Sequence, residues 1–236
     1  MRFETSPFLY KLNYLIKHKA CVSIILSFLR FKITKPFFNT FRSKEKKKYK
    51  VTIKDKLLTN DFFSINVFDW KRNLKEYKKK DISYLEIGSF EGISAYFVYT
   101  FFKNKNIHCV DTWEGSNEHA NGTNFKDVEF KFDNNLGNLK NLYKYKNTSD
   151  NFFDNNQNLF DIIYIDGLHK YYQVKKDLNN ALKYLKEGGI IICDDYFWNL
   201  DEHKLEIPIS AINEVVNENK LKIVAVTANQ IFLKKD

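Results

Sequence analysis

Five carboxylates stand at the ends of short apolar runs in this sequence: Glu86, Asp111, Asp166, Asp194 and Asp195. If the runs are parallel strands of one sheet, their carboxyl ends meet at a single edge, where such sheets bind ligands. Carboxylates at that edge can pair with a cationic group, accept ribose hydroxyls or coordinate a divalent cation. The residues that could bind ligands or metal ions are therefore predicted to lie together at one edge of the sheet.

The first run continues into a turn with two glycines, Gly88 and Gly92, which let the backbone pass close to a ligand. The GxGxxG pattern of dinucleotide sites is absent, because Phe90 occupies its middle glycine. Glu86 would repel a pyrophosphate and suits a cationic amino acid. Asp111 ends the next run, 23 residues after Gly88, where a carboxylate accepts both ribose hydroxyls.

A cationic amino acid joined to a ribose is S-adenosylmethionine. The sequence therefore predicts this molecule as the ligand of Glu86 and Asp111. The alternative is that the two carboxylates only cap loops.

The other three carboxylates predict a metal site. Asp166 ends one run, and Asp194 and Asp195 end the next, 28 residues after Asp166. Three clustered carboxylates repel one another unless a cation joins them. Ligand sets made of oxygen favour Mg²⁺, Mn²⁺ or Ca²⁺ over zinc. In the alternative interpretation, Asp166 serves the S-adenosylmethionine side and the aspartate pair caps the following loop.

His169 follows Asp166 by three residues, in the same predicted loop. An imidazole with an ordinary pKa of about 6.5 can take a proton from a hydroxyl at neutral pH. His169 is therefore the predicted general base, against the alternative of a purely structural histidine.

The elements that must position these residues follow from the apolar runs. Two of the runs are continuous and β-branched, as expected for strands buried on both faces. The pattern from 174 to 185 repeats every 3.6 residues and predicts a helix, which Gly188 and Gly189 would end. Residues 61–80 predict a helical lead-in. Seven strands are expected, at residues 84–87, 107–110, 142–145, 160–165, 189–193, 221–227 and 230–233.

Strands alternating with helices predict an α/β, Rossmann-like doubly wound sheet of about seven strands, mostly parallel. The last two runs are separated by only two residues, which is too short for a parallel crossover. They predict an antiparallel hairpin at the C-terminal end of the sheet.

The charge of the 236 residues divides the chain in two. Residues 1–50 hold thirteen Lys or Arg and two acidic residues, whereas residues 51–236 hold 25 basic and 27 acidic residues. We therefore expect a basic, partly apolar extension over 1–50 and the folded domain over 51–236, with no specific nucleic-acid partner for that domain. The three cysteines are far apart, which indicates neither a disulfide framework nor a zinc site and suits the cytoplasm.

Segment 20–29 contains ten residues without a charge, too few to span a bilayer. It predicts an amphipathic helix that packs on the domain or stays loose. Basic flanking residues leave open a peripheral contact with an anionic membrane. The lysine run at 44–50 leaves open nonspecific binding of nucleic acid.

Four blocks of the sequence, at 85–94, 110–115, 164–169 and 188–196, carry a family resemblance. Together they resemble the class I S-adenosylmethionine-dependent methyltransferases, especially the metal-dependent macrolide-sugar and catechol-type O-methyltransferases. The resemblance runs from about residue 60 to the end. Phe90 departs from the usual ExGxGxG block, but catechol-type enzymes also carry a bulky residue there.

The resemblance implies methyl transfer to a hydroxyl of a sugar, glycan or small molecule, with metal on Asp166, Asp194 and Asp195 and with His169 as base. We expect the acceptor pocket in loops 115–135 and 196–207. The polar, Asn-rich composition of segment 114–135 predicts a mobile lid. A metal-independent methyltransferase and a non-catalytic protein that keeps the fold are the alternatives. The oligomeric state is left open. The expected S-adenosylmethionine contacts are Glu86, Gly88, Ser89, Gly92, Asp111, Ser149 and Asp166.

Overall fold

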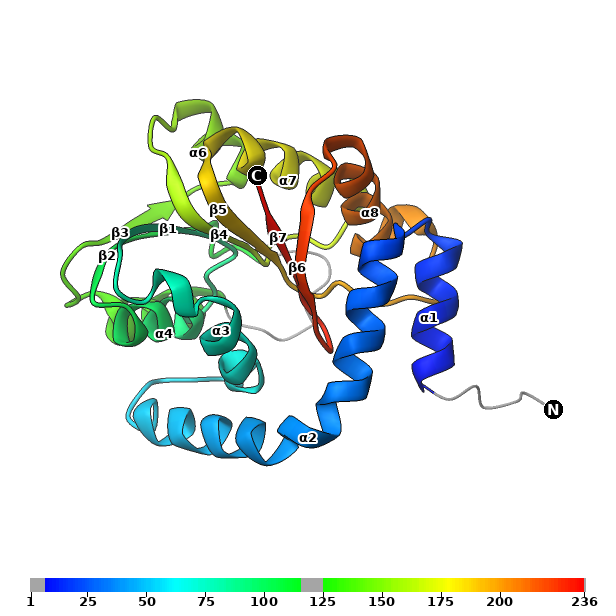
Figure 1. The fold of residues 1–236 in the computed structure, drawn as a ribbon. Coiled ribbons are helices and arrows are strands. Elements are labelled where there is room, and N and C mark those ends of the chain that lie inside the picture. Colours follow the sequence, from blue (N-terminus) through cyan, green and yellow to red (C-terminus); the bar gives the residue numbers. More distant parts are fainter. Residues whose placement is uncertain (1–6, 116–124, 236) are drawn as a thin grey trace.

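The computed structural model describes residues 7–115 and 125–235, and its centre is one seven-stranded sheet (Figure 1). The strand order is β3-β2-β1-β4-β5-β7-β6. The first five are parallel neighbours, and β7 runs antiparallel to both β5 and β6. The predicted fold class is confirmed, including the C-terminal hairpin. The strands are β1 (Asp81–Ile87), β2 (Asn104–Asp111), β3 (Leu142–Lys146), β4 (Phe160–Ile165), β5 (Leu185–Cys193), β6 (Lys222–Val226) and β7 (Ile231–Lys234).

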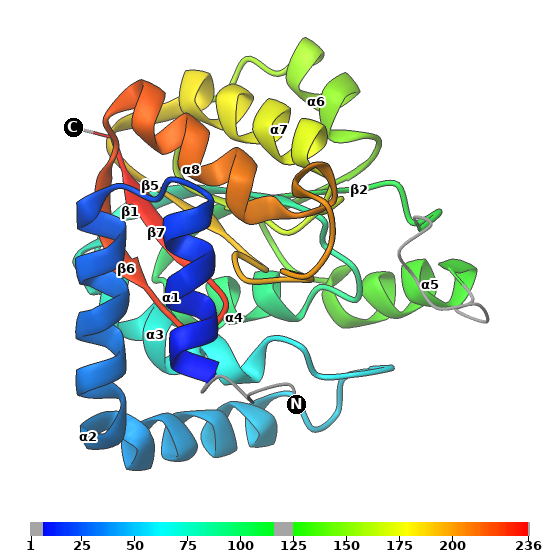
Figure 2. The ribbon, with the colours of Figure 1, turned by 90° about the vertical axis from the view of Figure 1, so that its right-hand side faces the viewer.

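Helices cover both faces of this sheet (Figures 1 and 2). Side chains that alternate along β1 and β4 enter two separate buried clusters, as a sheet covered on both faces requires. The helices, with η for a 3₁₀ helix, are α1 (Pro7–Lys17), α2 (Val22–Thr52), η1 (Ser64–Asn66), α3 (Val67–Asn73), η2 (Lys75–Tyr77), α4 (Ile93–Phe101), α5 (Phe125–Leu136), α6 (Ser149–Asn155), α7 (Tyr171–Tyr184), η3 (Lys204–Glu206) and α8 (Pro208–Asn219).

Two local predictions are wrong. The glycines at 188 and 189 do not end a helix, because α7 ends at Tyr184 and β5 begins at the next residue. Residues 125–135, predicted as loop, lie in α5. Val128, Phe132 and Leu136 recur at helical spacing there and are buried, which explains the helix. The rest of the predicted lid, residues 116–124, lies outside the described residues.

The basic N-terminal segment wraps around the edge of the sheet. In Figure 1, α2 bends sharply near its middle, and Pro36 lies inside it. We call residues 22–35 its first arm and residues 37–52 its second arm. Ile24 and Phe28 of the first arm enter one buried cluster, and Tyr49 of the second arm enters the other. Each arm therefore packs on a different face of the sheet.

The first arm of α2 lies beside the edge strand β6, with α1 next to it (Figure 2). The backbone N–H of Val226 donates to Ser27 Oγ at 2.9 Å, and Lys11 Nζ donates to the carbonyl of Ala228 at 2.7 Å. Such a cover protects an exposed strand edge from pairing with other chains. Residue 50, the predicted boundary, falls in the last turn of α2.

Among the described residues, every helix is too short or too polar to cross a lipid bilayer.

Candidate active site

The turn after β1 requires its two glycines. Gly88 has φ +87°, and a Cβ there would lie 2.0 Å from the carbonyl oxygen of Asp166. Gly92 has φ +82°, and its Cβ would meet Leu136 at 2.4 Å. Only glycine fits both the left-handed backbone and this close approach. The turn thereby holds the end of β1 tightly against the end of β4.

Glu86 lies fully buried near the end of β1. Ser94 Oγ, in the first turn of α4, donates to Oε1 of its carboxylate. Oε2 is buried with no hydrogen-bond partner among the described residues. Burial raises the pKa of Glu86 to about 8, more than the Ser94 hydrogen bond lowers it, and the nearby charge of Asp111 raises it further. An open carboxylate oxygen in this position fits a cationic ligand group.

Asp111 bridges the loops that follow β1 and β2. Its Oδ2 accepts from the backbone N–H of Phe90, and its Oδ1 accepts from that of Trp113, both at 2.8 Å. The indole N–H of Trp113 in turn donates to the carbonyl of Phe90 at 2.9 Å. Phe90 and Trp113 both have positive φ, which these hydrogen bonds help to hold. The structure thus accommodates phenylalanine at the position of the middle glycine in the ExGxGxG pattern.

The acidic residues after β4 and β5 are close together. Tyr164 Oη lies 2.9 Å from Asp166 Oδ2 and also contacts Asp194 Oδ2. A hydroxyl can donate only one hydrogen, so the second contact requires a proton on a carboxyl. Burial raises the pKa of Asp166 well above its usual range, and the charges of Asp194 and Asp195 raise it further. Burial and the charge of Asp195 likewise raise the pKa of Asp194 to about 6.

One ligand atom from each of Asp166, His169 and Asp195 lies within 4.8 Å of the others. His169 Nε2 is 3.1 Å from Asp195 Oδ2, and its ring lies 4.7 Å from that of Trp198. Asp195 has φ +49°, a strained backbone that aims its side chain into this group. Two crowded carboxylates and an imidazole fit a divalent cation, whose charge would relieve their repulsion. We call these three residues the Asp–His–Asp cluster.

Asp194 lies beside this cluster but faces other partners. Its Oδ1 accepts from the backbone N–H of Asp195 at 2.8 Å, and its Oδ2 accepts from Gln230 Nε2 at 2.9 Å. Gln230 Oε1 in turn accepts from the indole N–H of Trp70 at 2.9 Å. The predicted role of Asp194 as a metal ligand stays a prediction. Its observed contacts tie it to Gln230, just before β7, and through Gln230 to Trp70 of α3.

Sequence reasoning missed Ser94, Tyr164 and Gln230. Ser94 is the last residue of the sequence block 85–94, eight residues after Glu86. Its position in the first helical turn after the glycines could have indicated its contact with Glu86. Tyr164 and Gln230 sit in apolar runs that predict only strand. Their roles depend on which strands become neighbours.

Two of the remaining predicted contacts can be placed. Ser149 is the first residue of α6, directly beyond β3, and its Oγ accepts from Gln173 Nε2 at 3.1 Å. Ser89 lies buried in the turn after β1, where its carbonyl accepts from the N–H of Gly92 at 2.8 Å. Both serines lie on the part of the sheet edge that carries Glu86 and Asp111. Their contact with S-adenosylmethionine remains a prediction.

Comparison with known proteins agrees with this geometry. Residues 85–196 match a family described as a methyltransferase domain. The chain is 35% identical over 124 residues to the uncharacterised protein R132 of Acanthamoeba polyphaga mimivirus, a match that covers 51% of this chain and 54% of that protein. The chain thus spans about half the length of this curated relative.

Two solved structures share the fold. The methyltransferase MycE of the mycinamycin pathway, in complex with Mg, SAH and mycinamycin VI, is 15% identical, with a TM-score of 0.58 over 82% of this chain and 54% of that chain. The O-methyltransferase TomG of Streptomyces achromogenes, in complex with SAM, is 12% identical, with a TM-score of 0.52 over 72% of this chain and 81% of that chain. Residues 85–196 thus match a methyltransferase domain, and the chain shares the fold of these two methyltransferases.

Proposed function

We propose that this protein transfers the methyl group of S-adenosylmethionine to a hydroxyl of a sugar, a glycan or another small molecule. One observation carries the proposal. The buried Glu86 with an open oxygen and the Asp–His–Asp cluster lie at the ends of the neighbouring strands β1, β4 and β5. A site for a cationic substrate thus adjoins a base and a set of metal-binding groups.

We place the two substrates at different parts of the edge, in agreement with the strand order. Asp111 ends β2 and would accept the ribose hydroxyls, while Glu86 on β1 would accept the ammonium of the methionine part. The methyl group would then point toward β4 and β5, where the cluster lies. The acceptor would bind on that side, near Trp198.

The reaction is an in-line displacement. A lone pair of the acceptor oxygen attacks the methyl carbon, and the carbon–sulfur bond breaks with its electrons passing to sulfur, which leaves neutral S-adenosylhomocysteine. The hydroxyl proton passes to Nε2 of His169. The protein mainly aligns the two substrates and removes this proton. A divalent cation held by Asp166 and Asp195 would supply Lewis acidity at the acceptor oxygen.

The acceptor class rests on two supports. MycE was solved with the small molecule mycinamycin VI, and MycE shares the fold of this chain. Residues 51–236 carry two more acidic than basic residues, which offers no electrostatic footprint for a nucleic acid.

Calorimetry with S-adenosylhomocysteine tests the proposal on the full chain, because α1 and α2 pack on the domain. We expect micromolar binding and, with Mg²⁺ present, an additional metal-dependent heat. Tritium transfer from labelled S-adenosylmethionine to a panel of sugars, vicinal diols and phenols then tests turnover. No heat at millimolar ligand, in a folded sample, would contradict the proposal. Tight binding without transfer to any hydroxylated acceptor would favour the non-catalytic alternative.

Replacing Asp166 by Asn should weaken binding of Mn²⁺ roughly 100-fold, because one of the charged donors is lost. The same variant should be more stable than the wild type at pH 7 without metal, since a crowded carboxylate becomes neutral. Electron paramagnetic resonance of free Mn²⁺ and urea unfolding measure the two effects. Asp154→Asn, an exposed aspartate on α6, is the matched control. Equal Mn²⁺ affinity in Asp166→Asn and the wild type would favour the metal-independent alternative.

A further inference from the structure

Large apolar side chains remain exposed along the outer side of α2. They are Val22, Leu26, Ile33, Phe37, Phe41 and, in the last turn, Val51; we call the first five the outer stripe. Their spacing follows the 3.6-residue period, so within each arm they share one helical face. Isolated exposed apolar residues are ordinary, but five along one helix are a surface feature.

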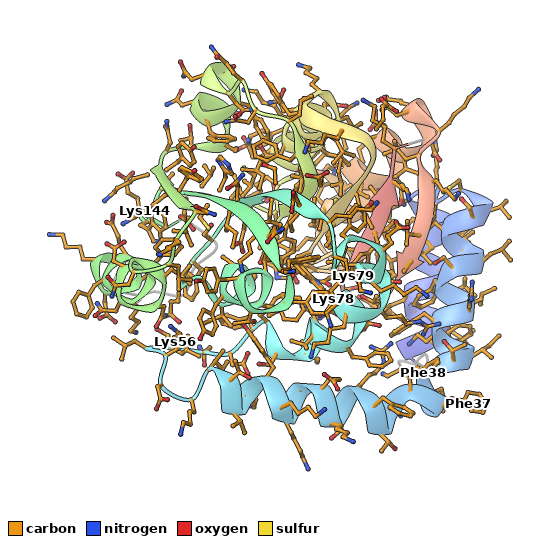
Figure 3. All side chains as sticks on the ribbon, turned by 60° about the vertical axis from the view of Figure 1, so that its left-hand side comes forward. Phe37, Phe38, Lys56, Lys78, Lys79 and Lys144 are labelled. Carbon is orange, nitrogen blue, oxygen red and sulfur yellow. The ribbon has the colours of Figure 1, made fainter. Side chains whose placement is uncertain are left out.

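The fold leaves this stripe uncovered by the described residues. The opposite side of α2 supplies the residues that pack on the sheet, such as Phe28 and Tyr49. At the bend, Phe38 packs against Phe68, with the guanidinium of Arg72 over its ring. The neighbouring Phe37 projects outward from the corner and is 77% exposed (Figure 3). Phe37 therefore stands on the convex side of the bend, where it can reach a flat surface.

Basic side chains surround the stripe. Residues 7–52 contain twelve Lys or Arg and a single acidic residue, Glu45. Glu45 is paired with Lys71 at 2.7 Å and lies near Lys48 at 3.5 Å, so its charge is already compensated. Arg30, Lys44 and Lys47 are exposed. An apolar convex face rimmed by positive charge complements a negatively charged surface with an apolar interior.

Three kinds of partner could cover such a face, and the charge and apolar pattern favours one. A second copy of this chain would bring two strongly basic segments together, and like charges oppose that contact. A nucleic acid would use the lysines but would gain little from Ile33, Phe37 and Phe41. An anionic bilayer uses both features, since apolar side chains enter the interface and basic ones meet lipid phosphates.

We propose that α2 docks the protein on anionic membrane surfaces, with the outer stripe inserted at the bend and Arg30, Lys44, Lys47 and Lys48 against the headgroups. The contact is peripheral, because no described helix can span a bilayer. The proposal does not depend on the identity of the methyl acceptor.

Sedimentation of the full chain with vesicles tests this proposal. We expect binding to phosphatidylcholine vesicles containing 30% phosphatidylglycerol, little binding to pure phosphatidylcholine, and weaker binding at high salt. Phe37→Ser/Phe41→Ser should reduce the partition coefficient by about tenfold or more. Its matched control, Leu159→Ser/Tyr172→Ser, removes two exposed apolar side chains elsewhere and should bind as the wild type does.

Variants that neutralise lysines test whether the basic residues of α2 contribute to membrane binding. Neutralising Lys44, Lys47 and Lys48 to Gln should reduce binding on the order of 100-fold, at about fivefold per lysine. Neutralising three exposed lysines elsewhere, Lys79, Lys103 and Lys183, should have little effect. All variants should keep wild-type affinity for S-adenosylhomocysteine, which separates this test from that of the methyltransferase activity.

Several results would overturn the proposal. Absence of binding to the anionic vesicles would do so directly. If Phe37→Ser/Phe41→Ser binds the anionic vesicles as tightly as the wild type does, the outer stripe does not insert and the binding is only nonspecific electrostatic adsorption. Sedimentation velocity that shows a wild-type dimer, lost in this variant, would assign the stripe to a second copy. A 20-base-pair RNA duplex that binds more tightly than the vesicles, regardless of the phenylalanines, would assign the surface to nucleic acid.

Discussion

Replacing Glu86 by Gln should stabilise the ligand-free protein at pH 8.5 and weaken its binding of S-adenosylhomocysteine by roughly 100-fold. Both effects have the same origin. Glu86 is fully buried and keeps one oxygen open, so its ionised form is costly until a cationic group pairs with it. A neutral glutamine avoids this cost but cannot attract the ammonium of the ligand.

The sign of the pH dependence follows from the pKa of Glu86, which is raised from an ordinary 4.5 to about 8 in the folded protein. Between these values the folded protein holds a proton that the unfolded chain has lost. The contribution of this group therefore stabilises the fold at low pH and is lost as the pH rises from about 4.5 to 8. The advantage of Glu86→Gln should be near zero at pH 4.5 and reach at most about 5 kcal/mol at pH 8.5.

Urea unfolding at pH 4.5 and 8.5 measures this difference, with the exposed Glu187→Gln as control. Calorimetry in two buffers of different ionisation enthalpy should show release of about one proton per bound ligand at pH 7 in the wild type only. Equal stability profiles would contradict the raised pKa of Glu86, and wild-type affinity in Glu86→Gln would show that Glu86 does not pair with the ligand.

The sequence allowed the mostly parallel sheet to be predicted, together with the placement of the carboxylates at the ends of its strands. Both depend on local patterns, since buried parallel strands are continuous apolar runs and the ligand groups follow them directly. The short link before the last run was enough to predict the antiparallel β6–β7 hairpin. Glu86, Asp111 and Asp166 therefore lie at the predicted edge, although their ligands remain proposals.

The remaining features of the site and of the fold could not be predicted, because they depend on contacts between residues that are far apart in the sequence. Trp70 and Gln230 are 160 positions apart and meet only because β7 inserts beside β5. Gln230 then holds Asp194, so the partner of a predicted metal ligand comes from the residue just before the last strand of the chain. The wrap of α2 around the sheet edge likewise depends on Ile24 and Tyr49 entering opposite clusters. No local pattern records either fact.

Replacing His169 by Gln should lower kcat by 10²- to 10³-fold on an acceptor found with the panel, a typical contribution of a general base. The KM for S-adenosylmethionine should change little, because Glu86 and Asp111 lie on the other side of the edge. His203→Gln, an exposed histidine beyond β5, is the matched control.

Metal affinity distinguishes a base from a metal ligand at this position, because His169 lies within the Asp–His–Asp cluster. A base can be removed with Mn²⁺ affinity nearly intact, and added imidazole should partly restore the activity of His169→Ala. A ligand cannot be removed without weakening Mn²⁺ binding in parallel with kcat. A kcat within threefold of the wild type in His169→Gln would refute the role of this residue as base. A parallel loss of Mn²⁺ affinity, without imidazole rescue, would instead make His169 the third ligand beside Asp166 and Asp195.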